Sequence, residues 1–144
     1  MSTIEELKCA GGIYFKNIQE GFDSYDYEVV KMTLDEAYRK ILSYYLLNGY
    51  ESSFVDFYYF RLEEDEKEKI ETFLSRDELN YLKELQKVRN SSDEIIFSID
   101  PTLLNITVKL NYYQALFSTF YFTKDPCTLW GNYNREYVIF KHKY

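Results

Sequence analysis

The residue types that most often carry out catalysis are scarce in this chain. His142 is the single histidine, so a Ser-His-Asp or Cys-His arrangement would have to use it. Only Lys143 and Tyr144 follow it, and a group at a chain end is hard to hold in the orientation that proton transfer needs. We therefore expect a solvated histidine and predict no catalytic residue and no enzyme activity.

The sequence also lacks the spacings that hold metal ions and cofactors. It contains no Cys-x-x-Cys and no His-Glu-x-x-His, and its two cysteines, Cys9 and Cys127, lie far apart. The acidic run 63–66 lacks the glycine and the Asp/Asn alternation of a calcium loop. Gly11 and Gly12 form a lone pair without the lysine of a phosphate-binding loop. We predict no metal site and no cofactor.

Tyrosine is the unusual residue, with 16 copies in 144 positions. Several tyrosines stand next to each other, as in Tyr58-Tyr59 and Tyr112-Tyr113. Neighbouring side chains point to opposite faces of a strand and diverge by about 100° on a helix. Some of the rings must therefore lie partly outside the core, where tyrosine is typical of binding surfaces.

Length and composition predict one compact domain over residues 1–144. Hydrophobic residues make up 46% of the chain, which argues against disorder. The 24 acidic and 17 basic residues give a net charge of −7, so we expect no direct binding to nucleic acid. No apolar run approaches the roughly 20 residues of a membrane helix, and the first residues do not resemble a signal peptide. We expect a cytoplasmic protein without membrane association.

Periodicity predicts an α+β fold, with about three central helices packed on a mostly antiparallel C-terminal β-meander of four or more strands. Capping boxes indicate helices over 33–49, 53–74 and 75–90. Alternation of apolar and polar residues predicts strands over 94–99, 104–112, 115–122 and 136–141. In the opening 32 residues, Ile4 to Cys9 suggests a short helix, and Gly11 to Phe15 and Tyr25 to Met32 suggest strands.

A small acidic domain with exposed tyrosines and no catalytic groups favours an inhibitor of another protein. Nucleic-acid-cutting toxins are basic because they grip phosphate, and an acidic partner is steered to them. Bacterial immunity proteins that neutralise such toxins share this size and charge. We expect a basic protein partner and two candidate surfaces. The first combines Asp23, Tyr25, Asp26, Tyr27 and Glu28, and the second combines Tyr59, Glu63, Glu64, Asp65 and Glu66.

Three alternatives belong to other classes. A phage-type inhibitor or nucleic-acid mimic that blocks a defence nuclease would space its acids along one elongated face. A ligand-binding module would hold an apolar molecule on an aromatic sheet face formed by Phe117, Tyr121, Tyr137 and Ile139. An enzyme of unrecognised type would need a pocket with perturbed acids.

Overall fold

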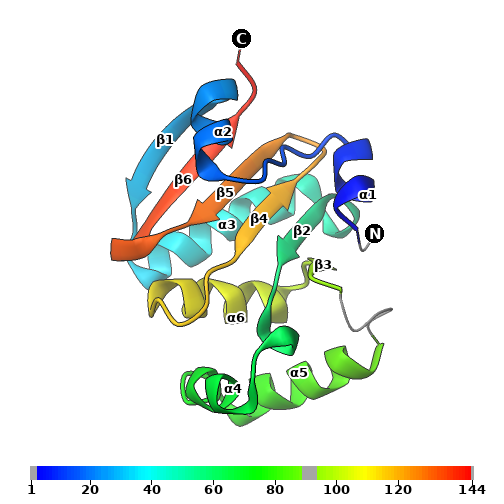
Figure 1. Ribbon diagram of the computed structural model, residues 1–144, viewed down its shortest axis with the longest axis vertical. Helices are drawn as coiled ribbons and strands as arrows, with labels where there is room; N and C mark the ends of the chain where they lie inside the picture. The colour runs from blue at the N-terminus through cyan, green and yellow to red at the C-terminus, as the bar shows by residue number, and fades with distance from the viewer. Residues whose placement is uncertain (1–2, 89–93, 144) are drawn as a thin grey trace.

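The computed structural model describes residues 3–88 and 94–143, and within them six strands form one antiparallel sheet (Figure 1). The strands are β1 (Asp26–Lys31), β2 (Ser53–Asp56), β3 (Ile96–Ser98), β4 (Thr119–Phe122), β5 (Cys127–Gly131) and β6 (Glu136–Lys141). Their order across the sheet is β1-β6-β5-β4-β2-β3. The fold is thus α+β, with β4, β5 and β6 forming a meander and β1 joined to its outer edge.

Helices cover one face of the sheet in two layers. Helices α3 (Leu34–Asn48) and α6 (Pro101–Tyr112) pack on the sheet and enclose the main core (Figure 1). Helix α5 (Arg76–Val88) packs on α6, where the Tyr81 hydroxyl donates to Asp100 Oδ2 at 2.8 Å. Helix α4 (Glu64–Glu71) adds Ile70 to the same core. The α5 and α4 layer therefore does not contact most of the sheet directly.

An N-terminal arm crosses the opposite face of the sheet (Figure 1). It contains α1 (Ile4–Cys9) and α2 (Ile18–Ser24). Leu7 packs against Phe54 and Tyr121, and the Thr128 hydroxyl donates to the Ile13 carbonyl at 2.6 Å. A second cluster joins Ile13 and Phe15 of the arm to Val138 and Phe140 of β6. The sheet therefore has apolar side chains on both faces, as a buried antiparallel sheet requires.

Several elements follow the sequence prediction closely. The Thr33 capping box begins α3, because the Thr33 hydroxyl accepts from Glu36 N and Glu36 Oε1 accepts from Thr33 N. Ser75 and Glu78 make the same pair of bonds before α5. The predicted end of α5 at Asn90 lies outside the described residues. The short helix over 4–9 and the strands over 94–99 and 136–141 are confirmed within a residue or two, as is the strand expected over 25–32.

The predicted helix over 53–74 is wrong. Its first four residues form β2, and all four are buried because β2 lies between β3 and β4. A short 3-10 turn (Tyr59–Arg61) follows, and α4 begins only after Glu63. The Ser53-x-x-Asp56 spacing resembles a capping box, but the Ser53 hydroxyl donates instead to the Gly49 carbonyl at 2.7 Å. Pairing of these buried residues with a strand on each side outweighs the local signal.

The predicted strand over 104–112 is also wrong, since these residues belong to α6. Asp100 caps the helix by accepting from Leu103 N at 2.8 Å, and Pro101 takes the first helical position. The apparent alternation arises because α6 is buried on almost every side, polar positions included. The Thr107 hydroxyl donates a hydrogen bond to the Leu103 carbonyl at 2.8 Å, so this polar residue is tolerated inside the core.

Two elements were not expected. Asn17 caps α2 by accepting from Glu20 N at 3.0 Å, in a segment between the two suggested strands for which no element is predicted. Strand β5 supplies the middle of the meander, and residues 12–15 form no strand. The sequence predicts that the strand over 94–99 pairs within a C-terminal meander. In the structure its neighbour is β2, which comes from the centre of the chain.

Candidate functional site

The first predicted surface lies where α2 passes into the edge strand β1. Asp23, Asp26, Tyr27 and Glu28 are exposed, and Tyr25 is half-buried. Tyr27 packs on Phe22 with ring centroids 4.6 Å apart and keeps 53% of its surface exposed. The five residues therefore gather at one edge of the sheet, as expected from their closeness in sequence.

Basic residues from the last strand interrupt this first surface. Lys141 lies opposite Asp26 in the β1–β6 register, and Lys143 Nζ donates to the Asp23 carbonyl at 3.2 Å. His142 lies beside Tyr25 with ring centroids 5.8 Å apart, on an exposed position. The surface consequently carries mixed charge and offers a basic partner no uniform negative field.

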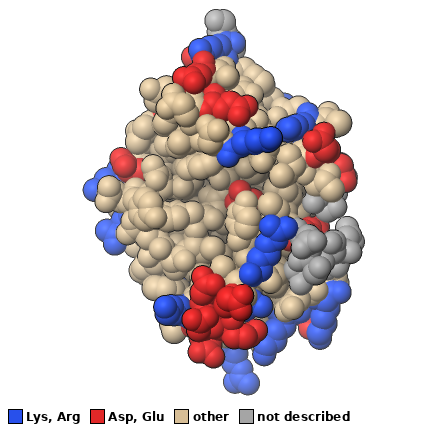
Figure 2. Space-filling model, viewed as in Figure 1, with Lys and Arg blue, Asp and Glu red and all other residues tan. Residues whose placement is uncertain are grey.

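The second predicted surface is more strongly acidic. Glu63, Glu64, Asp65 and Glu66 are exposed at the start of α4, and residues 63–71 contain six acids and two bases, a net −4. Figure 2 shows the largest group of acidic atoms on the visible face in this lower part of the molecule. The predicted Tyr59 does not share this exposure, because only 8% of its surface is accessible.

Tyr59 instead supports the acidic turn from beneath. Burial raises its pKa to about 12, and Glu71 and Glu64 add to the shift. Lys67 Nζ lies 5.6 Å from its ring centroid and 3.9 Å from Glu64 Oε1. Lys67 thus lies between the Tyr59 ring and Glu64, one of the predicted acids.

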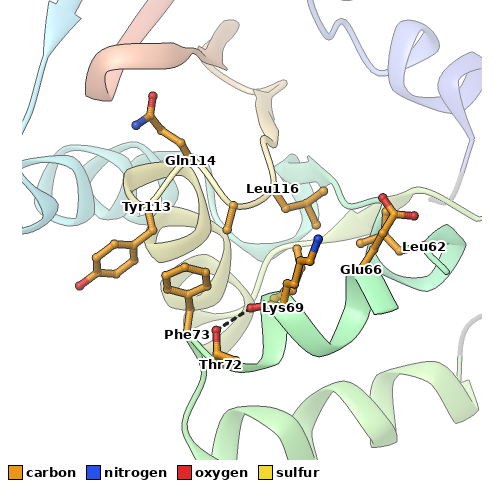
Figure 3. A pocket seen from close by; sticks show the side chains of 10 residues that line it. Leu62, Glu66, Lys69, Thr72, Phe73, Tyr113, Gln114 and Leu116 are labelled. Atoms are coloured by element: carbon orange, nitrogen blue, oxygen red, sulfur yellow. Dashed lines mark hydrogen bonds between the residues drawn. The ribbon is translucent and has the colours of Figure 1, made fainter. Parts of the chain in front are cut away.

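An apolar groove of about 610 Å³ lies between α4 and the segment after α6 (Figure 3). Phe73 and Tyr113 stack at one end with centroids 5.1 Å apart, and 38% and 45% of their surfaces are exposed. Leu62 and Leu116 lie at the other end, next to the predicted residue Glu66. We call this the α4 groove. Its aromatic pair comes from segments forty residues apart, which no sequence pattern connects.

A second hollow lies on the face crossed by the N-terminal arm, and sequence reasoning missed it. Asp56, at the end of β2, has only 9% of its surface exposed and borders a cleft of about 310 Å³. Its Oδ1 accepts a hydrogen bond from Thr119 N at 2.7 Å. Burial raises the pKa of this carboxyl to about 7, and the Thr119 bond is the opposing cause. We call this the Asp56 cleft.

Aromatic rings form most of the Asp56 cleft. Thr119 lies opposite Trp130 in the β4–β5 register, so the floor is a row across adjacent strands. Tyr58, Phe117 and Tyr133 stand around it. In Figure 2 the middle of this face consists mainly of uncharged residues, with charged ones toward the periphery.

Neighbouring rings hold the walls of the Asp56 cleft in place. Phe15 of the N-terminal arm stacks on Trp130 with centroids 5.6 Å apart, and Phe117 meets Tyr133 edge-on at 4.9 Å. Tyr133 remains 66% exposed, so the cleft is open on one side.

The four residues expected to form an aromatic ligand-binding face, Phe117, Tyr121, Tyr137 and Ile139, do not share one. Tyr137 and Ile139 belong to the core under the helices, whereas Tyr121 packs under the N-terminal arm. Phe117 lines the Asp56 cleft, and Ile139 lines a separate hollow beside β1. The four residues were expected on neighbouring strands, but the unexpected β5 lies between β4 and β6, and the face of each residue depends on its register.

The remaining ionisable groups serve the structure. Burial alone would raise the pKa of Glu78, but the bonds from Lys109 and Ser75 outweigh it and the pKa is lowered. Burial raises the pKa of the Cys127 thiol to about 12, so it is protonated and a weak nucleophile. Cys9 and Cys127 are both free thiols.

Comparison with known proteins supplies no relative, since no family model, no curated protein and no solved structure matches the chain. Among residues 3–88 and 94–143, none of the helices combines the length and hydropathy needed to cross a membrane. The same residues contain no cluster of three or more histidine, cysteine or acidic side chains able to hold a metal ion. The function must therefore be inferred from the two hollows and the charge.

Proposed function

We propose that this protein binds and neutralises a basic protein partner, as an immunity protein does, and that the α4 groove is its docking surface. One observation carries the proposal: four consecutive exposed acids, Glu63 to Glu66, lead into a groove of about 610 Å³ that Glu66 itself lines together with Lys69. An apolar centre with a charged rim is the usual anatomy of a protein–protein interface.

The charge of the rim selects the occupant. With a net −4 over residues 63–71, the rim attracts a basic segment and repels an acidic one. Steering of this kind raises the rate of association and weakens with salt. The exposed Phe73–Tyr113 pair would then supply an aromatic contact at one end of the groove, and aromatic residues often contribute most to affinity.

The first predicted surface remains a second contact region in this proposal. Its edge strand β1 is exposed along almost its full length, but Lys141 and Lys143 reduce its attraction for a basic protein. The phage-type inhibitor and the nucleic-acid mimic would use the same acids against a nuclease. The identity of the captured partner separates these readings.

The test is capture of the partner from cells that carry the native neighbouring genes, followed by washes of increasing salt. The variant Glu63→Gln/Glu64→Gln/Asp65→Asn removes three rim charges but keeps Glu66, whose Oε1 accepts from Glu63 N at 3.3 Å. The matched control, Asp77→Asn/Glu84→Gln, removes exposed acids from α5. We expect one basic protein, held more weakly at high salt, retained by the control and lost at least tenfold by the rim variant.

Two results would overturn the proposal. Equal retention of the partner by the rim variant and the wild type would show that the α4 rim is not the contact. A stable dimer in sedimentation experiments, abolished by Phe73→Ser, would show that the groove is occupied by a second copy of this chain.

A further inference from the structure

The Asp56 cleft has a chemistry that the α4 groove lacks. Asp56 takes part in none of the ion pairs found among the described residues. Its one hydrogen bond comes from a backbone N–H, which is neutral. Burying a carboxyl without a cation is costly, and proteins usually replace or pair such a group. A buried acid that opens on a cavity is a common property of ligand-binding sites.

The groups facing Asp56 offer no internal cation. Burial raises the pKa of the Tyr58 and Tyr121 hydroxyls, and the charge of nearby Asp56 raises both further. The charge of Tyr14 also raises both pKa values, whereas the charge of Arg61 lowers the pKa of Tyr58 alone. The carboxyl is thus surrounded by hydroxyls and rings, and the open side of the cleft is where a cation can enter.

We propose that the Asp56 cleft binds a small alkylammonium ion, with the Asp56 carboxylate as counter-ion and the rings of Trp130 and Tyr133 as aromatic walls. Cations bind over aromatic faces because the ring quadrupole is negative there, and tryptophan is the strongest such face. Sites for quaternary ammonium groups combine several rings in this way. The cleft volume of about 310 Å³ suits a small molecule.

The surrounding contacts prepare the cleft for such a ligand. Phe15 lies against Trp130 and Phe117 lies against Tyr133, so the rings are held before a ligand arrives. Preformed walls reduce the entropy lost on binding. The Thr119 N–H, bonded to Oδ1, also holds the orientation of the carboxyl.

The same chemistry could come from a free amine or from the lysine of a protein. Two probes separate these sources: choline carries a quaternary ammonium, and butylammonium has the primary ammonium of a lysine side chain. Uncharged dimethylbutanol, the carbon isostere of choline, measures the contribution of the charge. Trp130 is the only tryptophan, so tryptophan-selective fluorescence reports on this cleft directly.

We expect saturable binding of choline that changes Trp130 fluorescence, confirmed by calorimetry, and at least tenfold weaker binding of dimethylbutanol. Asp56→Asn keeps an oxygen for the Thr119 N–H and should weaken choline binding at least tenfold. Tyr133→Ala changes an exposed wall residue, leaves the core intact, and should weaken it several-fold. Asp77→Asn, which removes an exposed carboxyl from α5, should bind choline as the wild type does.

The proposal is overturned if neither ammonium probe binds, if dimethylbutanol binds as tightly as choline, or if Asp56→Asn has no effect. Preference for butylammonium over choline would assign the site to a primary ammonium, the group that a lysine side chain also carries. The proposal is independent of partner binding at the α4 groove. Phe73→Ser should therefore leave choline affinity unchanged, and failure of either proposal can be recognised separately.

Discussion

Asp56 Oδ1 accepts a 2.7 Å hydrogen bond from Thr119 N, and this bond joins the end of β2 to the start of β4 at the mouth of a cleft. The two residues are 63 positions apart in the sequence. The buried Asp56 carboxyl thus bonds β2 to β4 at the end of their paired region. Its position links the stability of the sheet to the protonation of one side chain.

We expect stability to fall as pH rises because of Asp56. Its pKa is about 7 in the folded chain against an ordinary 3.8, so the folded state binds more protons between these values. The favourable contribution of Asp56 to the free energy of unfolding is complete below about pH 4 and is lost as pH rises through 7. The difference is on the order of 4 kcal/mol at most. Urea unfolding of the wild type and Asp56→Asn across pH 4 to 8 measures it.

Asp56→Asn should therefore be more stable than the wild type above pH 7, although it removes a proposed ligand contact. Functional groups often reduce stability in this way. The exposed-site control Asp77→Asn should follow the wild-type pH profile. Identical pH profiles for Asp56→Asn and the wild type would contradict the assignment of a raised pKa to Asp56.

The ion pair between α5 and α6 should be essential to their packing. Lys109 Nζ lies 2.6 Å from Glu78 Oε1, and the Glu78 side chain is only 7% exposed. Lys109→Met leaves that carboxylate buried without its cation, which should cost about 3 kcal/mol at pH 7. The pKa of Glu78 is lowered in the wild type, so the pair stabilises above about pH 4.5 and the loss should shrink on acidification.

Lys87→Met is the matched control for this ion pair. Lys87 and Glu84 pair at 3.2 Å on the same helix, but both side chains are 71% exposed. The control should change the free energy of unfolding by less than about 1 kcal/mol. Equal losses of unfolding free energy in Lys109→Met and Lys87→Met would show that burial of Glu78 does not determine the cost of breaking its ion pair.

Gly131→Ala should destabilise the sheet next to the Asp56 cleft. An added Cβ would lie 2.8 Å from Asn111 Oδ1, which accepts from Ser118 N. Asn111 also donates to the Tyr137 hydroxyl at 3.1 Å, so displacing it breaks a buried network. We expect a loss of about 2 kcal/mol in thermal or urea unfolding. The comparison variant is Gly49→Ala, which meets no atom but adopts φ +85, and should lose about 1 kcal/mol.

Phe73→Ala should weaken partner binding without affecting the core. The ring is partly exposed and stacks on Tyr113, so its loss should cost less than about 1 kcal/mol of folding stability. Affinity for the captured partner should fall at least tenfold, as for an aromatic contact at the centre of an interface. Val88→Ala, which removes an apolar side chain that is 71% exposed on α5, should change neither property. Unchanged affinity in Phe73→Ala would move the interface elsewhere.

Local signals predicted the elements that carry their own caps. The Thr33 and Ser75 boxes place α3 and α5 correctly because their bonds lie within four residues. The errors concern β2 and α6, whose surroundings decide their state. β2 is buried between two strands, and α6 is buried on almost every side, so periodicity no longer separates an inner from an outer face.

The candidate site was predictable only in part. The acids at 63–66 form one continuous run, so the sequence locates an acidic surface whose last member, Glu66, lines the α4 groove. Phe73 and Tyr113 meet through tertiary packing, and Asp56, Trp130 and Tyr133 meet through strand register. Asp56 was assigned to a helix, and only a correct assignment of β2 and β4 would place it in a cleft.

The pairing of β1 with β6 has a consequence for how the molecule is made. Asp26 lies opposite Lys141, so among the six described strands the first in the sequence pairs with the last. Until β6 has been synthesised, β1 carries an unpaired backbone and the apolar side chains Tyr27 and Val29. Long-range pairings of this kind are slow to form. Completion of the sheet must therefore follow synthesis of the chain through β6.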